Sequence, residues 1–320
     1  MSLAPYVRIL GRGPGRSRSL TLEEAREAMA LMLQGDAAPE AVGALLMLMR
    51  MKGETPDEIA GFASAVGAAL PPLPRPALDW PSYAAGRTRG LPWFLLSARL
   101  VARAGHSVLM HGFNGSDAAV RQGLAAAQIP VVSDPDECAQ MLAQGGVAYL
   151  PLETLSPQLF ALLTLRDVLG LRSCVNTVCR MLNPGGAAAS VQGVFHPSYR
   201  GLQTEAAQLL GLDSQTVIKG GGGEFERHAG KEIATFGLRH GAPWQDTAPA
   251  LIEETRRLDD GDTDPAHLAA LWDGTRDDPF AVAIVTGTAA LALATLGHDQ
   301  PEALAQSLWA GRHRALAACN

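Results

Sequence analysis

The sequence predicts an α/β protein in which a small N-terminal helical domain, residues 1–72, precedes a larger domain, residues 77–320, with a mostly parallel central sheet. Residues 21–70 carry helical periodicity and helix-capping sequences, and a proline-rich segment, 71–76, follows them. Beyond that segment, strand-like and helix-like stretches alternate, which is typical of α/β domains. A length of 320 residues suits two domains of ordinary size.

The predicted helical domain contains three helices after residue 20. Thr21–Glu24 is a capping box, in which the Thr side chain and the Glu side chain bind each other's backbone amides, and Gly35 supplies a left-handed stop. Pro39 opens a second helix that ends near Gly53. Thr55–Glu58 repeats the capping box, with proline in the first turn, and starts a third helix. Short helices of this kind must pack on one another and on a further surface.

The larger domain is predicted from alternating apolar segments. Prolines in 71–76 favour extended backbone, so the domain boundary is expected there. The expected elements are a helix at 93–104, a strand at 107–110, a helix at 116–128, a strand at 130–133, further strands at 147–150, 190–195 and 216–218, and a buried helix or strand–helix pair at 279–296.

Composition indicates a compact soluble protein. Hydrophobic residues make up 47% and charged residues 18%. No uninterrupted apolar run of roughly 18 residues occurs, and the N-terminus lacks a secretory pattern, so no membrane contact and a cytoplasmic location are expected. The four cysteines have no zinc or redox spacing, which favours inert buried thiols.

The net charge of -6 is unevenly distributed. Residues 246–278 hold ten acidic and three basic residues, which leaves 23 basic and 22 acidic residues elsewhere. Two segments are arginine-rich, and arginines can bind phosphates. The candidate phosphate-binding or nucleic-acid-binding residues are Arg8, Arg12, Arg16, Arg18, Arg87, Arg89, Arg99 and Arg103.

Two loops contain further candidate residues for binding an anion or a metal ion. The glycines of Lys219–Glu224 allow backbone amides to face an anion, but a plain loop fits equally well because no phosphate-binding motif is completed. Glu224 and Glu226 are candidate Mg²⁺ ligands, with solvated carboxylates as the alternative. Arg87 and Arg89 follow a predicted strand end, where α/β sheets bind ligands; surface arginines are the competing interpretation.

A polar corner follows the strand predicted at 107–110. His111 and Gly112 stand at its end, and Asn114, Ser116 and Asp117 come next. A lone histidine is more often structural than catalytic. No Ser, His and Asp set has triad spacing, so hydrolysis is disfavoured and no catalytic residue is assigned.

These segments together resemble the anthranilate phosphoribosyltransferase and pyrimidine phosphorylase superfamily, the glycosyltransferase family 3 fold, over nearly the whole chain. The resemblance implies that fold, with helices around residues 155–185 joining the helical domain. The matching segments, in family order, are Arg50-Met51-Lys52-Gly53-Glu54-Thr55, His111-Gly112, Leu169-Gly170-Leu171-Arg172-Ser173, Asn176 and Asn183-Pro184.

Finer details resemble a divergent subgroup, the YbiB-type DNA-binding proteins. That resemblance implies a homodimer formed through the helical domain and nucleic-acid binding without an established reaction. The segments that carry it are Gly11-Arg12-Gly13, Pro81-Ser82-Tyr83, His196-Pro197-Ser198-Tyr199 and Gly222-Gly223-Glu224.

The chain departs from the enzymes' motifs at three places. The glycine-rich loop that holds the pyrophosphate of phosphoribosyl pyrophosphate (PRPP) becomes Tyr83 to Gly90, and the Lys-His-Gly-Asn-Arg motif becomes Met110 to Asn114. The acidic metal pair falls on Phe225 and Glu226. The resemblance therefore implies a vestigial substrate pocket, with Arg166 or Arg172 as the substrate-binding arginine. Its candidate residues are Ser82, Tyr83, His111, Gly112, Asn114, Arg166 and Arg172.

Three functions follow from these observations. The preferred one is a non-catalytic protein that binds the backbone of single- or double-stranded DNA or RNA, whatever its sequence, through arginine-lined grooves. The alternative is a glycosyl- or phosphoribosyltransferase that uses PRPP and Mg²⁺ on an unidentified small acceptor. The third is a scaffold dimer that recruits another protein. The choice between DNA and RNA, and the direction that the acidic segment 246–278 faces, stay open.

Overall fold

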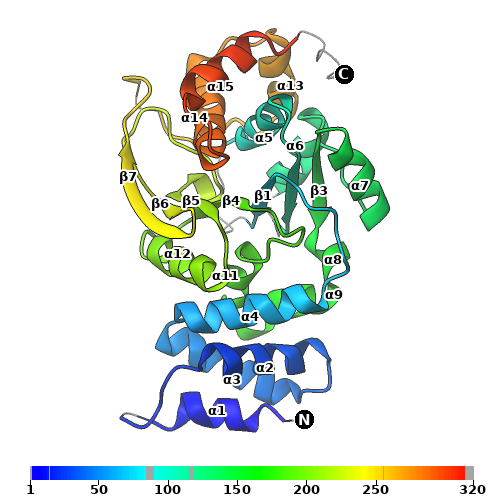
Figure 1. Ribbon diagram of the computed structural model, residues 1–320, viewed down its shortest axis with the longest axis vertical. Helices are drawn as coiled ribbons and strands as arrows, with labels where there is room; N and C mark the ends of the chain where they lie inside the picture. The colour runs from blue at the N-terminus through cyan, green and yellow to red at the C-terminus, as the bar shows by residue number, and fades with distance from the viewer. Residues whose placement is uncertain (1, 14, 84–89, 115–117, 255, 314–320) are drawn as a thin grey trace.

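The computed structural model describes residues 2–13, 15–83, 90–114, 118–254 and 256–313. The molecule is elongated, with a layer of helices at one end and an α/β domain at the other (Figure 1). The N-terminus lies at the helical end, and α15 (Pro301–Ala310) lies at the far end of the α/β domain. The arrangement confirms the predicted fold class.

The helical layer is formed first by α1 (Ala4–Gly11), α2 (Leu22–Leu33), α3 (Pro39–Lys52) and α4 (Pro56–Ala69). Both predicted capping boxes are present, at Thr21 and at Thr55. Gly35 and Gly53 take positive φ where their helices end. Helix α1 was not predicted, because its segment was interpreted as an arginine-bearing arm; Leu3 and Leu10 bury it against the layer.

The layer is completed by chain from the middle of the sequence. After the third strand the chain forms α8 (Leu152–Leu155), α9 (Pro157–Thr164), α10 (Arg166–Leu169) and α11 (Val175–Arg180). Their apolar residues share one core with α3 and α4. For example, Cys174 Sγ lies 3.9 Å from Met49 Sδ of α3.

The sheet of the α/β domain has the order β3-β2-β1-β4-β5-β6-β7. Strands β1 to β5 pair in parallel, and β6 and β7 add an antiparallel hairpin at one edge. The sheet is therefore mostly parallel, as predicted. The strands are β1 (Leu78–Ser82), β2 (Val108–Gly112), β3 (Val147–Pro151), β4 (Ala189–Val194), β5 (Ser214–Lys219), β6 (Ile233–Arg239) and β7 (Ala242–Ala248).

A second core covers the sheet on the side of the long apolar helix α14 (Pro279–Thr295). Trp80 of β1 packs there edge-on against Phe225, with ring centroids 5.4 Å apart. The remaining helical elements around the sheet are α5 (Phe94–Arg103), α6 (Ala118–Ala126), α7 (Pro135–Ala143), α12 (Tyr199–Leu209), the short 3-10 turn η1 (Gly221–Gly223) and α13 (Ala266–Asp273).

The strands differ from the prediction in two places. The strand expected at 130–133 is reduced to one bridge between Val131 and Tyr149. The β6–β7 hairpin was not anticipated, and its turn places His240 and Gly241 at φ of 50° and 71°. A histidine there is uncommon, and most of β7 is exposed, so no hairpin signal marked it.

The cysteines in the described chain, Cys138, Cys174 and Cys179, are free and buried; Cys319 lies outside the described residues. Burial raises the pKa of the Cys138 thiol to about 11. No helix within the described ranges has the length and apolarity needed to cross a membrane.

Candidate functional site

The carboxyl ends of the parallel strands carry a buried polar network. At the end of β1, the Tyr83 hydroxyl is hydrogen-bonded to Nδ1 of His111 in β2 at 2.9 Å. His111 Nε2 lies 3.2 Å from Asp79 Oδ1, close enough for electrostatic attraction but without hydrogen-bond alignment. All three side chains are at most 1% exposed, and burial raises the pKa of Tyr83 well above its usual value. His111 is therefore held inside the protein by neighbouring strands.

A second polar chain lies beside the first. Asn114 Nδ2 donates to Ser82 Oγ at 3.1 Å, and the Tyr149 hydroxyl donates to Asn114 Oδ1 at 3.0 Å. Gly112 permits this close packing, since a Cβ there would lie 1.9 Å from the Ser82 carbonyl oxygen. The structure thus brings together Ser82, Tyr83, His111, Gly112 and Asn114, which sequence patterns singled out separately. Their polar groups are mostly engaged with one another.

The accessible hollow at this edge lies between the helical layer and the ends of the strands. This interdomain pocket has a volume of about 230 Å³ and is lined from α3, α11, α12 and the end of β4. Arg50, Arg172 and Arg180 line it, together with Asn176 and His196. Three guanidinium groups in one small hollow suit an anionic ligand, because each can donate two parallel hydrogen bonds to carboxylate or phosphate.

Arg180 links this pocket to the buried network. It is 8% exposed, its Nη1 donates to the Asn176 carbonyl at 3.0 Å, and its Nη2 donates to the Tyr83 carbonyl. Burial lowers the pKa of Arg180, and the nearby charge of Glu224 opposes that shift. Sequence reasoning did not single out Arg180, although a cation inside the otherwise uncharged segment 174–182 was an available signal.

Of the two candidate substrate-binding arginines, only Arg172 lines the pocket. Burial lowers its pKa, and the positive charges of Arg166 and Arg180 lower it further. Arg166 points instead toward Asp167, with Nε 3.4 Å from the carboxylate. The clustering of like charges around Arg172 would be relieved by a bound anion.

The two candidate metal ligands are buried in the structure. Glu226 Oε2 accepts a hydrogen bond from the backbone amide of Phe94 at 2.9 Å, in the first turn of α5. Glu224 is 1% exposed, and its charge acts on Arg180 and Tyr149. Within the described ranges, no three His, Cys, Asp or Glu residues form a group that could hold a metal ion. Glu224 and Glu226 could supply at most two carboxylates, so a Mg²⁺ ion held by them would take its remaining ligands from water and from a bound phosphate.

The glycine-rich loop after β5 is packed tightly against the protein. A Cβ on Gly220 would lie 1.7 Å from the Glu224 carbonyl oxygen, and one on Gly193 would lie 2.0 Å from the Glu224 carbonyl carbon. These glycines allow close approach of two backbone segments. Of the two interpretations of the loop, the structural one accounts for both positions.

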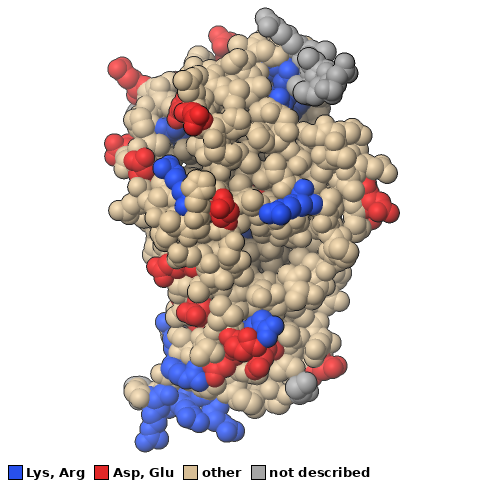
Figure 2. All heavy atoms as spheres, in the orientation of Figure 1, with Lys and Arg blue, Asp and Glu red and all other residues tan. Residues whose placement is uncertain are grey.

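The candidate phosphate-binding arginines are separated along the molecule. Arg8, Arg12, Arg16 and Arg18 lie in or after α1 at the helical end, where Figure 2 shows basic side chains gathered. Arg18 forms an ion pair with Glu24 at 2.6 Å.

The other described arginines of this set belong to α5 in the α/β domain. Arg99 stacks on Trp272 with its guanidinium carbon 3.9 Å from the ring centroid, and Arg103 donates to the Gly311 carbonyl at 3.1 Å. Arg87 and Arg89 lie outside the described residues, as do Ser116 and Asp117. One chain therefore does not bring the arginines of α1 and α5 to a common groove (Figure 1).

Comparison with known proteins agrees with the fold. The model for the helical bundle domain of a glycosyl transferase family matches residues 4–69, and the model for the α/β domain matches residues 94–251. An anthranilate phosphoribosyltransferase of Agrobacterium fabrum is 27% identical over 96% of this chain and 90% of its own length. The corresponding protein of Methylobacterium nodulans is 28% identical, with coverage of 96% and 93%.

Solved structures give the same fold. The anthranilate phosphoribosyltransferase of Thermus thermophilus superposes with a TM-score of 0.77 at 23% identity, covering 97% of this chain and 95% of that one. The Saccharomyces cerevisiae protein in complex with PRPP and Mg gives a TM-score of 0.74 at 14% identity, with coverage of 96% and 92%.

Proposed function

The chain belongs to the glycosyl transferase family that these two domain models describe, and we propose that it is a phosphoribosyl-type transferase whose interdomain pocket binds a small anionic molecule. The curated relatives named above are anthranilate phosphoribosyltransferases. For this chain the proposed reactants are a phosphorylated sugar donor, with PRPP as the first candidate, and a small acceptor that carries an acid group.

The observation that carries this proposal is the set of three arginines around the interdomain pocket. Arg50 of α3, Arg172 and Arg180 all belong to the helical layer, whereas His196, which follows β4, lines the pocket from the α/β domain. A ligand in this hollow would be held from both domains at the carboxyl ends of the strands, where open α/β sheets bind their ligands. Charge-assisted hydrogen bonds from these groups would fix a carboxylate or phosphate in one orientation.

The protein's own contribution to transfer would be positioning and electrostatic stabilisation. Arg180 is held between the Asn176 and Tyr83 carbonyls, so its charge is fixed before the ligand arrives. Preorganised cations stabilise developing negative charge without further rearrangement. No step in this proposal is assigned to a metal ion.

Binding of PRPP and of anthranilate to the wild type tests the proposal, by calorimetry and by thermal unfolding. A ligand at about 100 times its Kd raises the apparent stability by about 2.7 kcal/mol. Arg172→Ala should weaken binding roughly 10- to 100-fold, because it removes hydrogen bonds to a charged group. Arg166→Ala is the matched control and should weaken binding far less, since Arg166 does not line the pocket and acts on it only through its charge near Arg172.

The reaction itself is then tested by following the loss of anthranilate fluorescence after PRPP is added. If neither compound binds the wild type, or if both arginine variants lose binding equally, the pocket is not the substrate site. If PRPP binds but anthranilate does not, the proposal keeps its donor and requires a different acidic acceptor.

A second function, nucleic-acid binding as in the YbiB-type proteins, rests on the exposed arginines at the helical end (Figure 2). Arg8, Arg12 and Arg16 are exposed and could neutralise backbone phosphates. Fluorescence-anisotropy titration of single- and double-stranded DNA at two salt concentrations tests it. Combined replacement of Arg12 and Arg16 by Ala should reduce both the affinity and its dependence on salt; unchanged binding would exclude this surface.

A further inference from the structure

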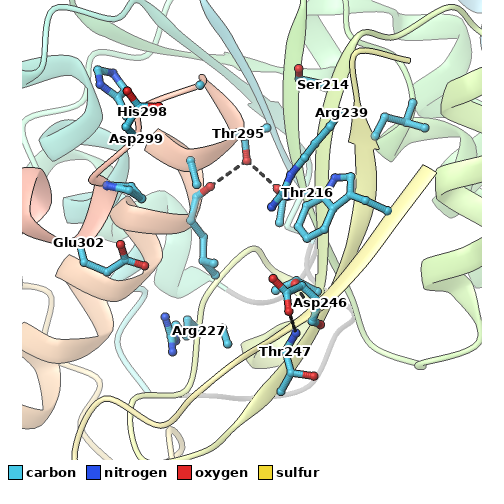
Figure 3. A pocket seen from close by; sticks show the side chains of 18 of the residues that line it. Ser214, Thr216, Arg227, Arg239, Asp246, Thr247, Thr295, His298, Asp299 and Glu302 are labelled. Carbon is cyan, nitrogen blue, oxygen red and sulfur yellow. Dashed lines mark hydrogen bonds between the residues drawn. The ribbon is translucent and has the colours of Figure 1, made fainter. Parts of the chain in front are cut away.

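A larger cavity, of about 590 Å³, lies between the sheet edge formed by β5, β6 and β7 and the helices α14 and α15. None of its lining residues lines the interdomain pocket. Figure 3 shows the strand side, with Asp246 and Thr247, facing the helical side, with Thr295, His298 and Glu302. The cavity therefore forms a second site with its own chemistry.

The base of the cavity contains a buried arginine, Arg227, which is 2% exposed. Its backbone amide donates to Thr288 Oγ1 at 2.9 Å, and its Nη2 donates to the Pro249 carbonyl. Gly287 of α14 makes room for its stem, because a Cβ there would lie 3.2 Å from Arg227 Cδ. The Nε–H of Arg227 has no hydrogen-bond partner within the described chain. A buried donor left in this state is unfavourable.

A second buried donor faces the same cavity from β7. The indole Nε1–H of Trp244 has no partner among the residues that the structure describes. The Arg239 guanidinium stacks on the indole ring, with its carbon 3.9 Å from the centroid, and holds the ring in place. Both unpartnered groups, on Arg227 and Trp244, can only donate, so they require an acceptor such as a carboxylate.

The walls and the rim of the cavity place two further requirements on a ligand. Leu238, Leu251 and Leu291 give the walls an apolar surface. The exposed carboxylates of Asp246 and Glu302 lie on opposite sides of the rim (Figure 3). Over the whole lining, the carboxylates of Asp246, Asp299 and Glu302 outnumber the guanidinium groups of Arg227 and Arg239, so an ammonium group would be attracted.

We propose that this cavity binds a small zwitterion with an apolar body, of the α-amino acid type. Its carboxylate would accept hydrogen bonds from Arg227 and Trp244, its apolar body would lie on the leucine wall, and its ammonium group would face Asp246 and Glu302. The site is separate from the proposed transferase pocket and does not depend on that function.

Calorimetric titration of the full chain with three matched probes tests the assignment. L-phenylalanine carries both charges, 3-phenylpropionate lacks the ammonium group, and 2-phenylethylamine lacks the carboxylate. L-phenylalanine should bind the tightest, and the amine, which cannot satisfy the buried donors, should bind roughly 10- to 100-fold more weakly. 3-Phenylpropionate should bind about two- to fivefold more weakly than L-phenylalanine, since the rim carboxylates that it leaves unused are exposed.

Variants then locate the bound probe. Trp244→Phe keeps an aromatic ring but removes the indole N–H, and should weaken L-phenylalanine binding about two- to tenfold. Glu302→Gln should weaken it about two- to fivefold, whereas Glu254→Gln, an exposed change outside the cavity, should have no effect.

Three results would overturn the assignment. The first is no binding of L-phenylalanine up to its solubility limit, and the second is equal binding of all three probes. The third is loss of binding in Arg172→Ala, which would place the amino acid in the interdomain pocket. Loss of PRPP binding in that variant, with L-phenylalanine binding retained, would separate the two sites.

Discussion

Glu58 should contribute more to stability than any other helix-capping residue of the helical layer. Its side chain is fully buried, its Oε2 accepts from the Thr55 amide at 2.9 Å, and its Oε1 accepts from the Leu20 amide at 2.8 Å. The second bond joins α4 to the start of α2. Replacing Glu58 by Ala leaves the buried Leu20 amide and the partly buried Thr55 amide without acceptors.

The expected loss for Glu58→Ala is about 3 kcal/mol, because each unsatisfied buried group is unfavourable by about 1–3 kcal/mol and such effects add incompletely. Glu24→Ala is the matched control, since Glu24 occupies the same capping-box position in α2 but is 25% exposed. Its loss should be about 1 kcal/mol, the usual effect of an exposed cap.

Urea unfolding should be followed by far-ultraviolet circular dichroism, because the five tryptophans lie between residues 80 and 309 and report on the α/β domain. Tryptophan fluorescence measured in parallel would separate loss of the helical layer from global unfolding. If Glu58→Ala and Glu24→Ala lower the free energy of unfolding by amounts equal within about 0.5 kcal/mol, then burial of Glu58 and its contact with Leu20 do not have the importance given to them.

Three further predictions follow from the structure. Glu24→Gln removes a carboxylate whose pKa is lowered from 4.5 to about 2, chiefly by a hydrogen bond from its arginine partner. Because the pKa of Glu24 is lower in the folded than in the unfolded state, its charge stabilises the folded protein fully above the unfolded-state pKa. The urea midpoints of wild type and variant should therefore differ at neutral pH and converge as the pH falls toward about 2. Gly112→Ala puts a methyl group 1.9 Å from a carbonyl oxygen and should destabilise the protein by about 1–3 kcal/mol or more. Gly201→Ala in α12, whose added methyl group meets nothing within 4 Å, should stabilise it by about 1 kcal/mol. A stabilising Gly112→Ala or a destabilising Gly201→Ala would contradict the packing described. His106 and His298 are 2.7 Å apart, and burial, then the charge of His298, lowers the pKa of His106. The stabilisation that comes from the lowered pKa of His106 is present above the usual histidine pKa and is lost as the pH falls through the folded-state pKa. His106→Asn should therefore reduce the loss of wild-type stability between about pH 7 and about pH 5, and an unchanged pH profile would show that His106 does not contribute to it.

Elements with local signals were predictable from the sequence. Helices α2, α3 and α4 begin at capping residues or prolines and end near glycine or proline, so their limits follow from short-range chemistry. Helix α1 has no side-chain cap and is stabilised by burial of Leu3 and Leu10 in a core formed by other segments. The β6–β7 hairpin likewise depends on pairing with β5, which no local pattern specifies.

The candidate site was predictable only in part, for a related reason. His111, Gly112 and Asn114 were recognisable because they lie at the end of a strand-like segment or just after it. Arg180 was not, because its position beside Tyr83 depends on how α11 packs against the end of β1. The partners of Glu226 were equally hidden, since Phe94 lies 132 residues away in the chain.

The way in which the helical layer is completed also limits how the two domains can move. Within the described chain, the backbone passes between the layers three times, through 71–77, through α8 and through 183–188. Three connections couple the domains, so any hinge between them must involve all three segments. A change in the width of the interdomain pocket would then require 71–77, α8 and 183–188 to bend together.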